Sequence, residues 1–289
     1  AYGSLMIVID RFTRYVYMIS IKPQATGDYD MPVIKINALD TYYDVYGEGD
    51  TIILLHNGFS CSKMWEKIVP MLVAAGFRVL VYDRRGYGQS PGGSDFEAHY
   101  VGKDFRNTAV AAMAHLVDHL GFETFHILGQ CEGGVVGVDY AVRFPDKVQT
   151  LTAASTLCFS DITLEAFNRL KFPPTYGDLP IHIRKKYADW HGPERAEAFY
   201  ALCSRYGGSY GRGLFDLRPE LQNVVCPTLV MYPDRGHFFE AEQGLAFFRS
   251  LSRGELAIFP RCGHNIVEHY PDLYAQTTVA FIERFRQGR

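Results

Sequence analysis

The pattern of apolar and polar positions predicts alternating β-strands and α-helices over most of the chain. Short, uninterrupted apolar runs are typical of strands that are buried on both faces of a parallel sheet. The segment 51–55 is such a run, and predominantly apolar segments that we also interpret as strands occur at 77–82, 124–128, 148–154, 227–231 and 257–259. Helical patterns lie between them, and two of these end at a glycine, Gly76 and Gly121. This alternation with short connections predicts an α/β protein with a mostly parallel sheet and helices on both faces.

Three segments depart from this alternation. Residues 33–36 and 41–46 are rich in β-forming side chains around a turn, which predicts a hairpin. The stretch 157–225 has helical patches, proline and glycine clusters and many aromatic residues, so we interpret it as an inserted helical cap. Residues 1–30 lie outside the plan and form an extension with a possible extra hairpin. The predicted core is therefore 31–156 together with 226–289.

Composition and charge exclude several classes of protein. The 289 residues carry 29 Lys and Arg against 32 Asp and Glu, without a basic block, so we expect no nucleic-acid partner. No apolar run reaches the roughly 18 residues that span a bilayer, and the apolar run 5–9 is too short for a signal peptide. We therefore expect a cytoplasmic protein without a membrane partner.

The six cysteines are scattered and contain no C-x-x-C spacing. This distribution argues against a zinc site and against a disulfide scaffold, so we expect reduced thiols and no metal or other cofactor. One of the six, Cys131, lies in a distinctive setting.

A predicted buried strand runs into the sequence Gly129-Gln130-Cys131-Glu132-Gly133 and then directly into a helix. The motif resembles the nucleophile elbow of the α/β-hydrolase superfamily, in which serine usually occupies the middle position. The nucleophile of such an elbow lies on a strained turn, so small residues are needed two positions before and after it. The helix N-terminus beneath it favours a thiolate. The resemblance covers about residues 31–289 and implies the α/β-hydrolase fold, with Cys131 as the nucleophile.

Two further segments resemble the same superfamily. His56-Asn57-Gly58-Phe59 follows the first parallel strand and is similar to the H-G-G-F loop, with Asn57 in place of the first glycine. The resemblance implies an oxyanion hole formed by the backbone N–H groups of Phe59 and Glu132. The segment 83–90 resembles the structural D-x-R-G-x-G-x-S signature.

The general base is expected at His264. This histidine follows Gly263 on a loop after the last predicted strand and precedes a helix, which resembles the loop that carries the catalytic histidine of the superfamily. It would activate the Cys131 thiol.

The acidic member of the expected triad is missing. The superfamily usually places Asp three residues after the turn that ends the penultimate strand, and Gly236 stands there. An alternative position, after the strand that begins near Val148, holds Ser155. We rank Asp234 first as the acid, Asp161 second, and a Cys-His dyad third, because a thiol needs less activation than a hydroxyl.

The pocket is harder to predict. We expect the Glu132 side chain to be solvated, with the mouth of the site as the alternative, where a carboxylate would oppose a thiolate. His56, Asn57, Tyr187 and Trp190 are candidate pocket residues. Most cap aromatics are expected to pack, and a few to wall an apolar pocket. These cap aromatics are Tyr187, Trp190, Tyr200, Tyr206 and Tyr210.

The cap length and loops resemble valacyclovir-hydrolase-like esterases, and the cysteine elbow resembles that of dienelactone hydrolases. We expect a cofactor-independent hydrolase of activated esters, lactones or thioesters, with a small acyl compound as its substrate. The alternatives are an acyltransferase or lyase on the same fold, or a catalytically weak ligand-binding relative. A further alternative is that Cys131 is an engineered replacement of an original serine, in which case the cysteine would trap acylated intermediates.

Overall fold

The computed structural model describes residues 5–9, 16–20, 32–206, 213–236 and 238–286. The chain forms two compact units, Ala1–Pro32 and Val33–Arg289. In the first unit, β1 (Leu5–Ile9) and β2 (Val16–Ser20) pair in an antiparallel manner.

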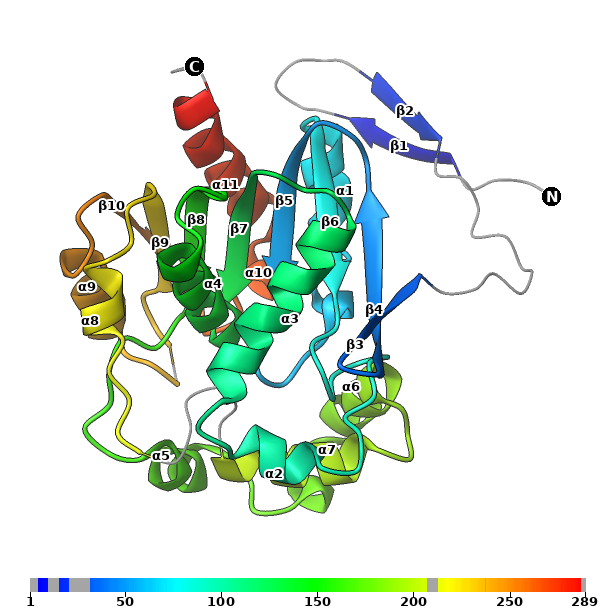
Figure 1. The fold of residues 1–289 in the computed structure, drawn as a ribbon, viewed down its shortest axis with the longest axis vertical. Helices are drawn as coiled ribbons and strands as arrows, with labels where there is room; N and C mark the ends of the chain where they lie inside the picture. The colour runs from blue at the N-terminus through cyan, green and yellow to red at the C-terminus, as the bar shows by residue number, and fades with distance from the viewer. Residues whose placement is uncertain (1–4, 10–15, 21–31, 207–212, 237, 287–289) are drawn as a thin grey trace. The chain divides into compact units, whose positions relative to one another are not determined.

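The second unit is built on an eight-stranded sheet in the order β10-β9-β8-β7-β5-β6-β4-β3 (Figure 1). The strands are β3 (Val33–Ile36), β4 (Leu39–Tyr46), β5 (Asp50–Leu55), β6 (Phe77–Tyr82), β7 (Phe125–Gln130), β8 (Val148–Ala154), β9 (Thr228–Pro233) and β10 (Gly254–Phe259). Strand β4 runs antiparallel to β3 and β6, and the other neighbours are parallel. The predicted α/β-hydrolase fold is confirmed.

Helices cover both faces of the sheet (Figure 1). One face carries α3 (Phe105–His119), α4 (Glu132–Arg143) and α9 (Ala241–Arg249), and the other carries α1 (Val69–Ala74), α10 (Ile266–His269) and α11 (Pro271–Arg286). A hydrophobic core lies on each side. Ile53 and Leu55 of β5 belong to one core, and Ile52 and Leu54 to the other. Burial on both faces explains why this strand is apolar throughout.

Further helices lie beyond the carboxyl ends of the parallel strands (Figure 1). These are α2 (Phe96–Tyr100) and, within the insertion between β8 and β9, α5 (Leu164–Lys171), α6 (Ile181–His191) and α7 (Ala196–Tyr206). The insertion also contains the turn η2 (Tyr176–Asp178) and the short α8 (Arg218–Leu221). Since α/β sheets bind ligands at this edge, the site is expected between the sheet and these helices.

The sequence pattern differs from the structure at one helix. The sequence pattern predicts one helix between the strands at 51–55 and 77–82, over residues 62–75 and ended by Gly76. The structure instead has a 3₁₀ turn, η1 (Ser62–Trp65), followed by the separate helix α1. Pro70 has no N–H to continue a helical hydrogen-bond ladder through this region, so it stands at the start of the second piece. Within the described ranges, no helix combines the length and apolarity needed to cross a bilayer.

Candidate active site

Cys131 lies on a strained turn between β7 and α4. Its backbone has φ 53° and ψ −115°, a conformation that is costly for a residue with a side chain. The Cys131 N–H donates to the carbonyl of Ala154 at 2.8 Å, and the Cys131 carbonyl accepts from the Gly134 N–H at 2.9 Å. These bonds hold the strained turn between the sheet and the first turn of the helix. The turn presents a half-buried thiol to the cavity.

The two glycines that flank Cys131 make the turn possible. A side chain at Gly129 would approach the Gly133 carbonyl oxygen to 2.5 Å, and one at Gly133 would approach the Leu55 carbonyl oxygen to 2.0 Å. Both distances are far below van der Waals contact with backbone that cannot yield. The small residues expected from the elbow spacing are therefore required by packing.

Arg84 holds the loop after β5 by hydrogen bonds to its backbone. This buried side chain donates to the carbonyl of His56 at 2.5 Å and to that of Asn57 at 3.2 Å. The Arg84 N–H also donates to Nε2 of His56, at 3.1 Å, while Nδ1 of His56 lies 2.8 Å from the Asn57 carbonyl. Burial and then the Arg84 charge keep the pKa of His56 well below its ordinary value, so this imidazole is neutral and fully bonded.

His56 therefore has a different place from the one expected. It is 1% exposed, and it is not among the described residues that line the cavity. The expectation that it contacts substrate gives way to a structural role, since both of its ring nitrogens are used to hold the loop. Asn57, by contrast, does line the cavity.

The Phe59 N–H, an expected oxyanion-hole donor, already has an acceptor. It donates to Oδ1 of Asn57 at 2.8 Å, closing a small turn within the loop. A substrate oxygen would have to replace the Asn57 side chain to use this donor. Gly58, between the two, also lines the cavity.

His191 of α6 joins the insertion to this loop. Its Nδ1 accepts from the Gly88 N–H at 3.0 Å, and its Nε2 lies 3.2 Å from the Phe59 carbonyl. Nδ1 is therefore the unprotonated nitrogen, and Nε2 donates. Burial lowers the pKa of His191 to about 4, so the ring is neutral at physiological pH.

The Glu132 side chain is not solvated, contrary to the sequence-based expectation. It is 1% exposed and pairs with Arg84, with Oε1 2.7 Å from Nη2, and it also accepts from the Tyr87 hydroxyl at 3.0 Å. Burial lowers the pKa of Arg84, but the Glu132 carboxylate and, after it, Tyr87 and Tyr82 together outweigh burial and raise that pKa. The charge that would have opposed a thiolate is thus paired with a guanidinium.

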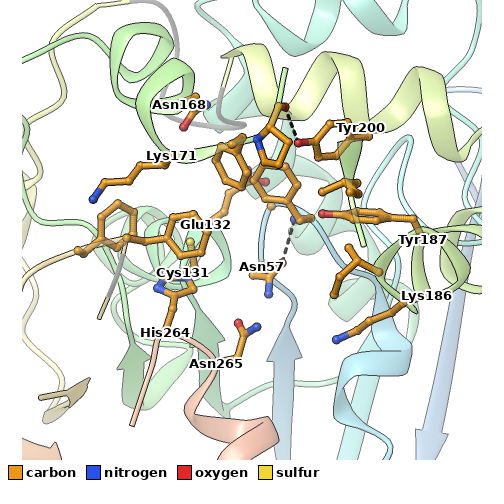
Figure 2. Close-up of a pocket in the computed structure, with 18 of the residues that line it drawn as sticks. Asn57, Cys131, Glu132, Asn168, Lys171, Lys186, Tyr187, Tyr200, His264 and Asn265 are labelled. Carbon is orange, nitrogen blue, oxygen red and sulfur yellow. Dashed lines mark hydrogen bonds between the residues drawn. The ribbon is translucent and has the colours of Figure 1, made fainter. Parts of the chain in front are cut away.

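His264 lies on the loop that connects β10 with α10 and faces the same cavity as Cys131 (Figure 2). Its backbone carbonyl accepts two hydrogen bonds, from Nε2 of Gln130 at 2.9 Å and from Oγ of Ser155 at 2.7 Å. Gln130 immediately precedes the nucleophile, and Ser155 occupies the second position at which the acid was sought. The residues around the elbow therefore fix the backbone of His264.

The Gly236 position has no room for the missing acid. A Cβ atom there would lie 2.3 Å from the Phe239 carbonyl oxygen. The rings of Phe238 and Phe239 both meet His264 edge-on, at centroid distances of 5.0 and 5.3 Å. Aromatic side chains thus surround the imidazole on the side of this loop.

Asp234 and Asp161 lie in different surroundings. The Asp234 carboxylate accepts from the Cys262 N–H at 3.1 Å and lies 3.3 Å from Nε of Arg235. A backbone hydrogen bond from Arg261 is the main reason why the pKa of Asp234 is lowered. Asp234 therefore holds the loop that leads to His264. Asp161 is exposed at the start of the insertion.

The cavity between the sheet and the insertion has a volume of about 390 Å³. Cys131 and His264 lie at one side of it, and Lys171, Lys186 and Asn265 also line it (Figure 2). Its wall is mostly apolar, and it includes the aromatic side chains of Phe59, Phe167, Phe172, Tyr187, Trp190 and Tyr200. Nζ of Lys186 lies above the Trp190 ring and pairs with Glu268 at 2.6 Å, which joins α6 to α10.

The expected pocket aromatics divide into two groups. Tyr187, Trp190 and Tyr200 line the cavity, whereas Tyr206 packs in a separate buried cluster with Tyr87 and Tyr100. Tyr210 lies outside the described residues. Phe238 and Phe239, which the sequence analysis did not single out, also line the cavity.

Known proteins resemble this chain over most of its length. A family model described as the alpha/beta hydrolase fold matches residues 50–190. The 2-hydroxy-6-oxo-6-phenylhexa-2,4-dienoate hydrolase of Burkholderia cepacia is 22% identical over 263 residues, covering 82% of this chain and 88% of the relative. The 2-hydroxy-6-oxononadienedioate/2-hydroxy-6-oxononatrienedioate hydrolase of Escherichia coli is 24% identical, covering 85% and 92%.

Solved structures share the fold. The enol-lactonase from Burkholderia xenovorans LB400 superposes with a TM-score of 0.67 at 19% identity, covering 87% of this chain and all of that one. The meta-cleavage product hydrolase from Pseudomonas fluorescens IP01 also gives 0.67 at 19% identity, covering 88% and 97%.

Proposed function

The chain has the α/β-hydrolase fold, and its sequence relatives support its placement in that superfamily of hydrolases; on this premise we propose that it is a cofactor-independent hydrolase acting through a Cys131 acyl-enzyme. The strained backbone of Cys131 is the observation that carries the proposal, because the fold holds this thiol at the N-terminus of α4 and against the cavity. Non-glycine residues held in such conformations cluster at active sites.

In the proposed reaction, His264 accepts the thiol proton and the Cys131 sulfur attacks the substrate carbonyl carbon. The tetrahedral oxyanion collapses, the bond to the leaving group breaks, and His264 returns the proton to that group. Water then loses a proton to His264 and attacks the thioester. The bond between the carbonyl carbon and the Cys131 sulfur breaks, His264 returns the proton to the sulfur, and the carboxylic acid leaves.

The oxyanion would be stabilised by backbone N–H groups at two places, the first turn of α4 at Glu132 and the 57–59 loop. A helix supplies no carbonyl to the N–H groups of its own first turn, and the dipole of α4 adds to their attraction for negative charge. The Phe59 N–H would join them when the Asn57 amide turns away.

The composition of the cavity supports an apolar acyl group on an activated carbonyl. Apolar side chains, many of them aromatic, form most of the wall, and a volume of about 390 Å³ suits a small molecule. A thiolate reacts best where the leaving group is good, which favours enol esters, lactones and thioesters over amides. The solved enol-lactonase with the same fold is consistent with this substrate class.

A catalytically weak ligand-binding protein is the second candidate function. Two observations favour it, namely the closed space at Gly236 and the Asn57 amide on the Phe59 N–H. An acyltransferase would differ from the hydrolase only in the acceptor, an alcohol, amine or thiol in place of water.

Turnover of a panel of enol esters, lactones and thioesters tests the proposal. We expect hydrolysis by the parent protein, and less than about 1% of that rate in Cys131→Ala, which lacks the nucleophile. Cys158→Ala, which removes another buried thiol away from the cavity lining, is the matched control. Equal turnover by Cys131→Ala and the parent would refute a Cys131 acyl-enzyme. Added acceptors that divert the product would indicate the transferase.

A further inference from the structure

The Arg84–Glu132 pair lies where the two parts of the proposed oxyanion hole meet. One part is the first turn of α4, which Glu132 opens, and the other is the loop after β5. Arg84 contacts both, through Oε1 of Glu132 at 2.7 Å and the carbonyls of His56 and Asn57 at 2.5 and 3.2 Å. Tyr87 donates to the same carboxylate oxygen at 3.0 Å.

The pair is buried and tightly packed. The side chains of Arg84 and Glu132 are 4% and 1% exposed. A Cβ atom on Gly58 would lie 2.7 Å from Oε2 of Glu132, so the loop backbone rests directly on the carboxylate. Burying an ion pair brings little net stability, because desolvation offsets most of the attraction. Its placement against both parts of the site indicates a positioning role.

We propose that Arg84 and Glu132 are positioning residues that fix the distance and orientation between the two parts of the oxyanion hole. By donating to the loop carbonyls, the guanidinium turns the peptide units at 56–58 so that their carbonyl oxygens face away from the cavity. Glu132 ties the guanidinium to the helix whose first N–H groups face the substrate. The inference rests on the proposed function, since it concerns the oxyanion of that reaction.

Two reactions of Cys131 distinguish a role in positioning the oxyanion hole from a general effect on the thiol. Iodoacetamide alkylates the thiolate by displacing iodide, and no oxyanion forms in that step. Acylation by an activated ester passes through a tetrahedral oxyanion and therefore needs the donors. Both rate constants are taken at their high-pH limits, where Cys131 is fully ionised and a change in its pKa no longer alters the thiolate fraction. The adducts are located by peptide mass.

Arg84→Met is expected to lower the limiting acylation rate constant by about tenfold or more, since a displaced oxyanion donor costs up to about 10²–10³. Its limiting alkylation rate should stay within about twofold of the parent. Arg84→Lys should recover part of the loss, because an ammonium can serve one carbonyl but lacks the planar fork. Arg85→Met is the matched control, since its side chain bonds Gly92 and Asp95 near the surface, and both of its rates should be unchanged.

Glu132→Gln keeps the size of the side chain and provides a second variant if Arg84→Met unfolds. It should lower acylation several-fold and leave alkylation unchanged. If Arg84→Met folds, a limiting acylation rate constant within about twofold of the parent value overturns the inference. If Arg84→Met does not fold, the same result in Glu132→Gln overturns it. Equal losses of acylation and alkylation in a folded variant also overturn it. A parent protein that is alkylated but never acylated at Cys131 instead overturns the proposed function, and the inference falls with it.

Discussion

The Phe239 ring meets the His264 ring edge-on, with the centroids 5.3 Å apart and the planes at 75°. The carbonyl oxygen of the same phenylalanine fills the space that a side chain at Gly236 would need. The loop that usually supplies a carboxylate to the catalytic histidine thus supplies aromatic contacts in this chain.

Gly236→Asp should therefore not create a working triad. A Cβ atom 2.3 Å from a backbone oxygen forces the loop to move, and overpacking of this kind costs about 1–3 kcal/mol. We expect a lower free energy of unfolding by chemical denaturation and no gain in kcat. Gly236→Ala meets the same clash and should lose similar stability. A rise in kcat for Gly236→Asp alone would show that an acid can reach His264 from this position.

Cys131→Ser distinguishes a natural cysteine enzyme from one in which cysteine stands in place of serine. A hydroxyl needs far more activation than a thiol, and removing the acid from a serine triad costs about 10⁴-fold in kcat. With no carboxylate at 236, we expect the serine variant to hydrolyse esters at least about 100-fold more slowly than the parent. Faster turnover by Cys131→Ser would indicate that the site was built for serine.

Asp234→Asn tests whether Asp234, the acid ranked first, is the acidic member of the triad. The carboxylate binds the Cys262 N–H and Arg235, on the loop that leads to His264. A loop-holding role predicts a lower denaturation midpoint and a fall in kcat of tenfold or less. A loss near 10⁴-fold at unchanged stability would make Asp234 the triad acid.

His191 should make the protein acid-sensitive. Burial lowers its pKa to about 4 from an unfolded value of 6.5, so the unfolded chain binds a proton at a pH where the folded chain does not. The stabilisation from the neutral ring is complete above about pH 6.5 and is lost as the pH falls towards 4, by up to about 3 kcal/mol. His56, whose pKa is also lowered, adds to this loss.

Denaturation midpoints between pH 7 and 4 test this expectation. His191→Gln should be less stable than the parent at pH 7, because it loses the bonds to Gly88 and Phe59, but its stability should depend less on pH. The same slope in both proteins would contradict the assignment. His269→Gln, which changes an exposed histidine, is the control.

The sequence predicted the fold and the elbow because both depend on local patterns. Apolar runs locate the strands, and the spacing of Gly129 and Gly133 around Cys131 reflects backbone contacts within a few residues. The Arg84–Glu132 pair could not be predicted, since its members lie 48 positions apart. Arg84 belongs to the structural signature at 83–90, whereas Glu132 belongs to the elbow motif. A glutamate in the first turn of a helix is usually solvated, and only the folded structure shows that the Arg84 guanidinium pairs with Glu132.

Two other parts of the site depend on contacts that a sequence does not show. Asn57 matches a glycine of the superfamily motif, but only the folded loop brings its amide to the Phe59 N–H. Helix α6 was not predicted, although Ile183, Tyr187 and Trp190 recur at helical spacing and Pro180 and Gly192 stand at its two ends; its packing against the loop is what the sequence does not show. Its last residue, His191, then contacts the loop from the insertion side.

The intact mass of the protein, rapidly quenched during turnover of an enol ester or thioester, tests the Cys131 acyl-enzyme most directly. We predict a transient mass increase equal to one acyl group, located on the peptide that contains Cys131 and absent from Cys131→Ala. Turnover without any adduct on that peptide, or an adduct that persists in Cys131→Ala, would contradict the account.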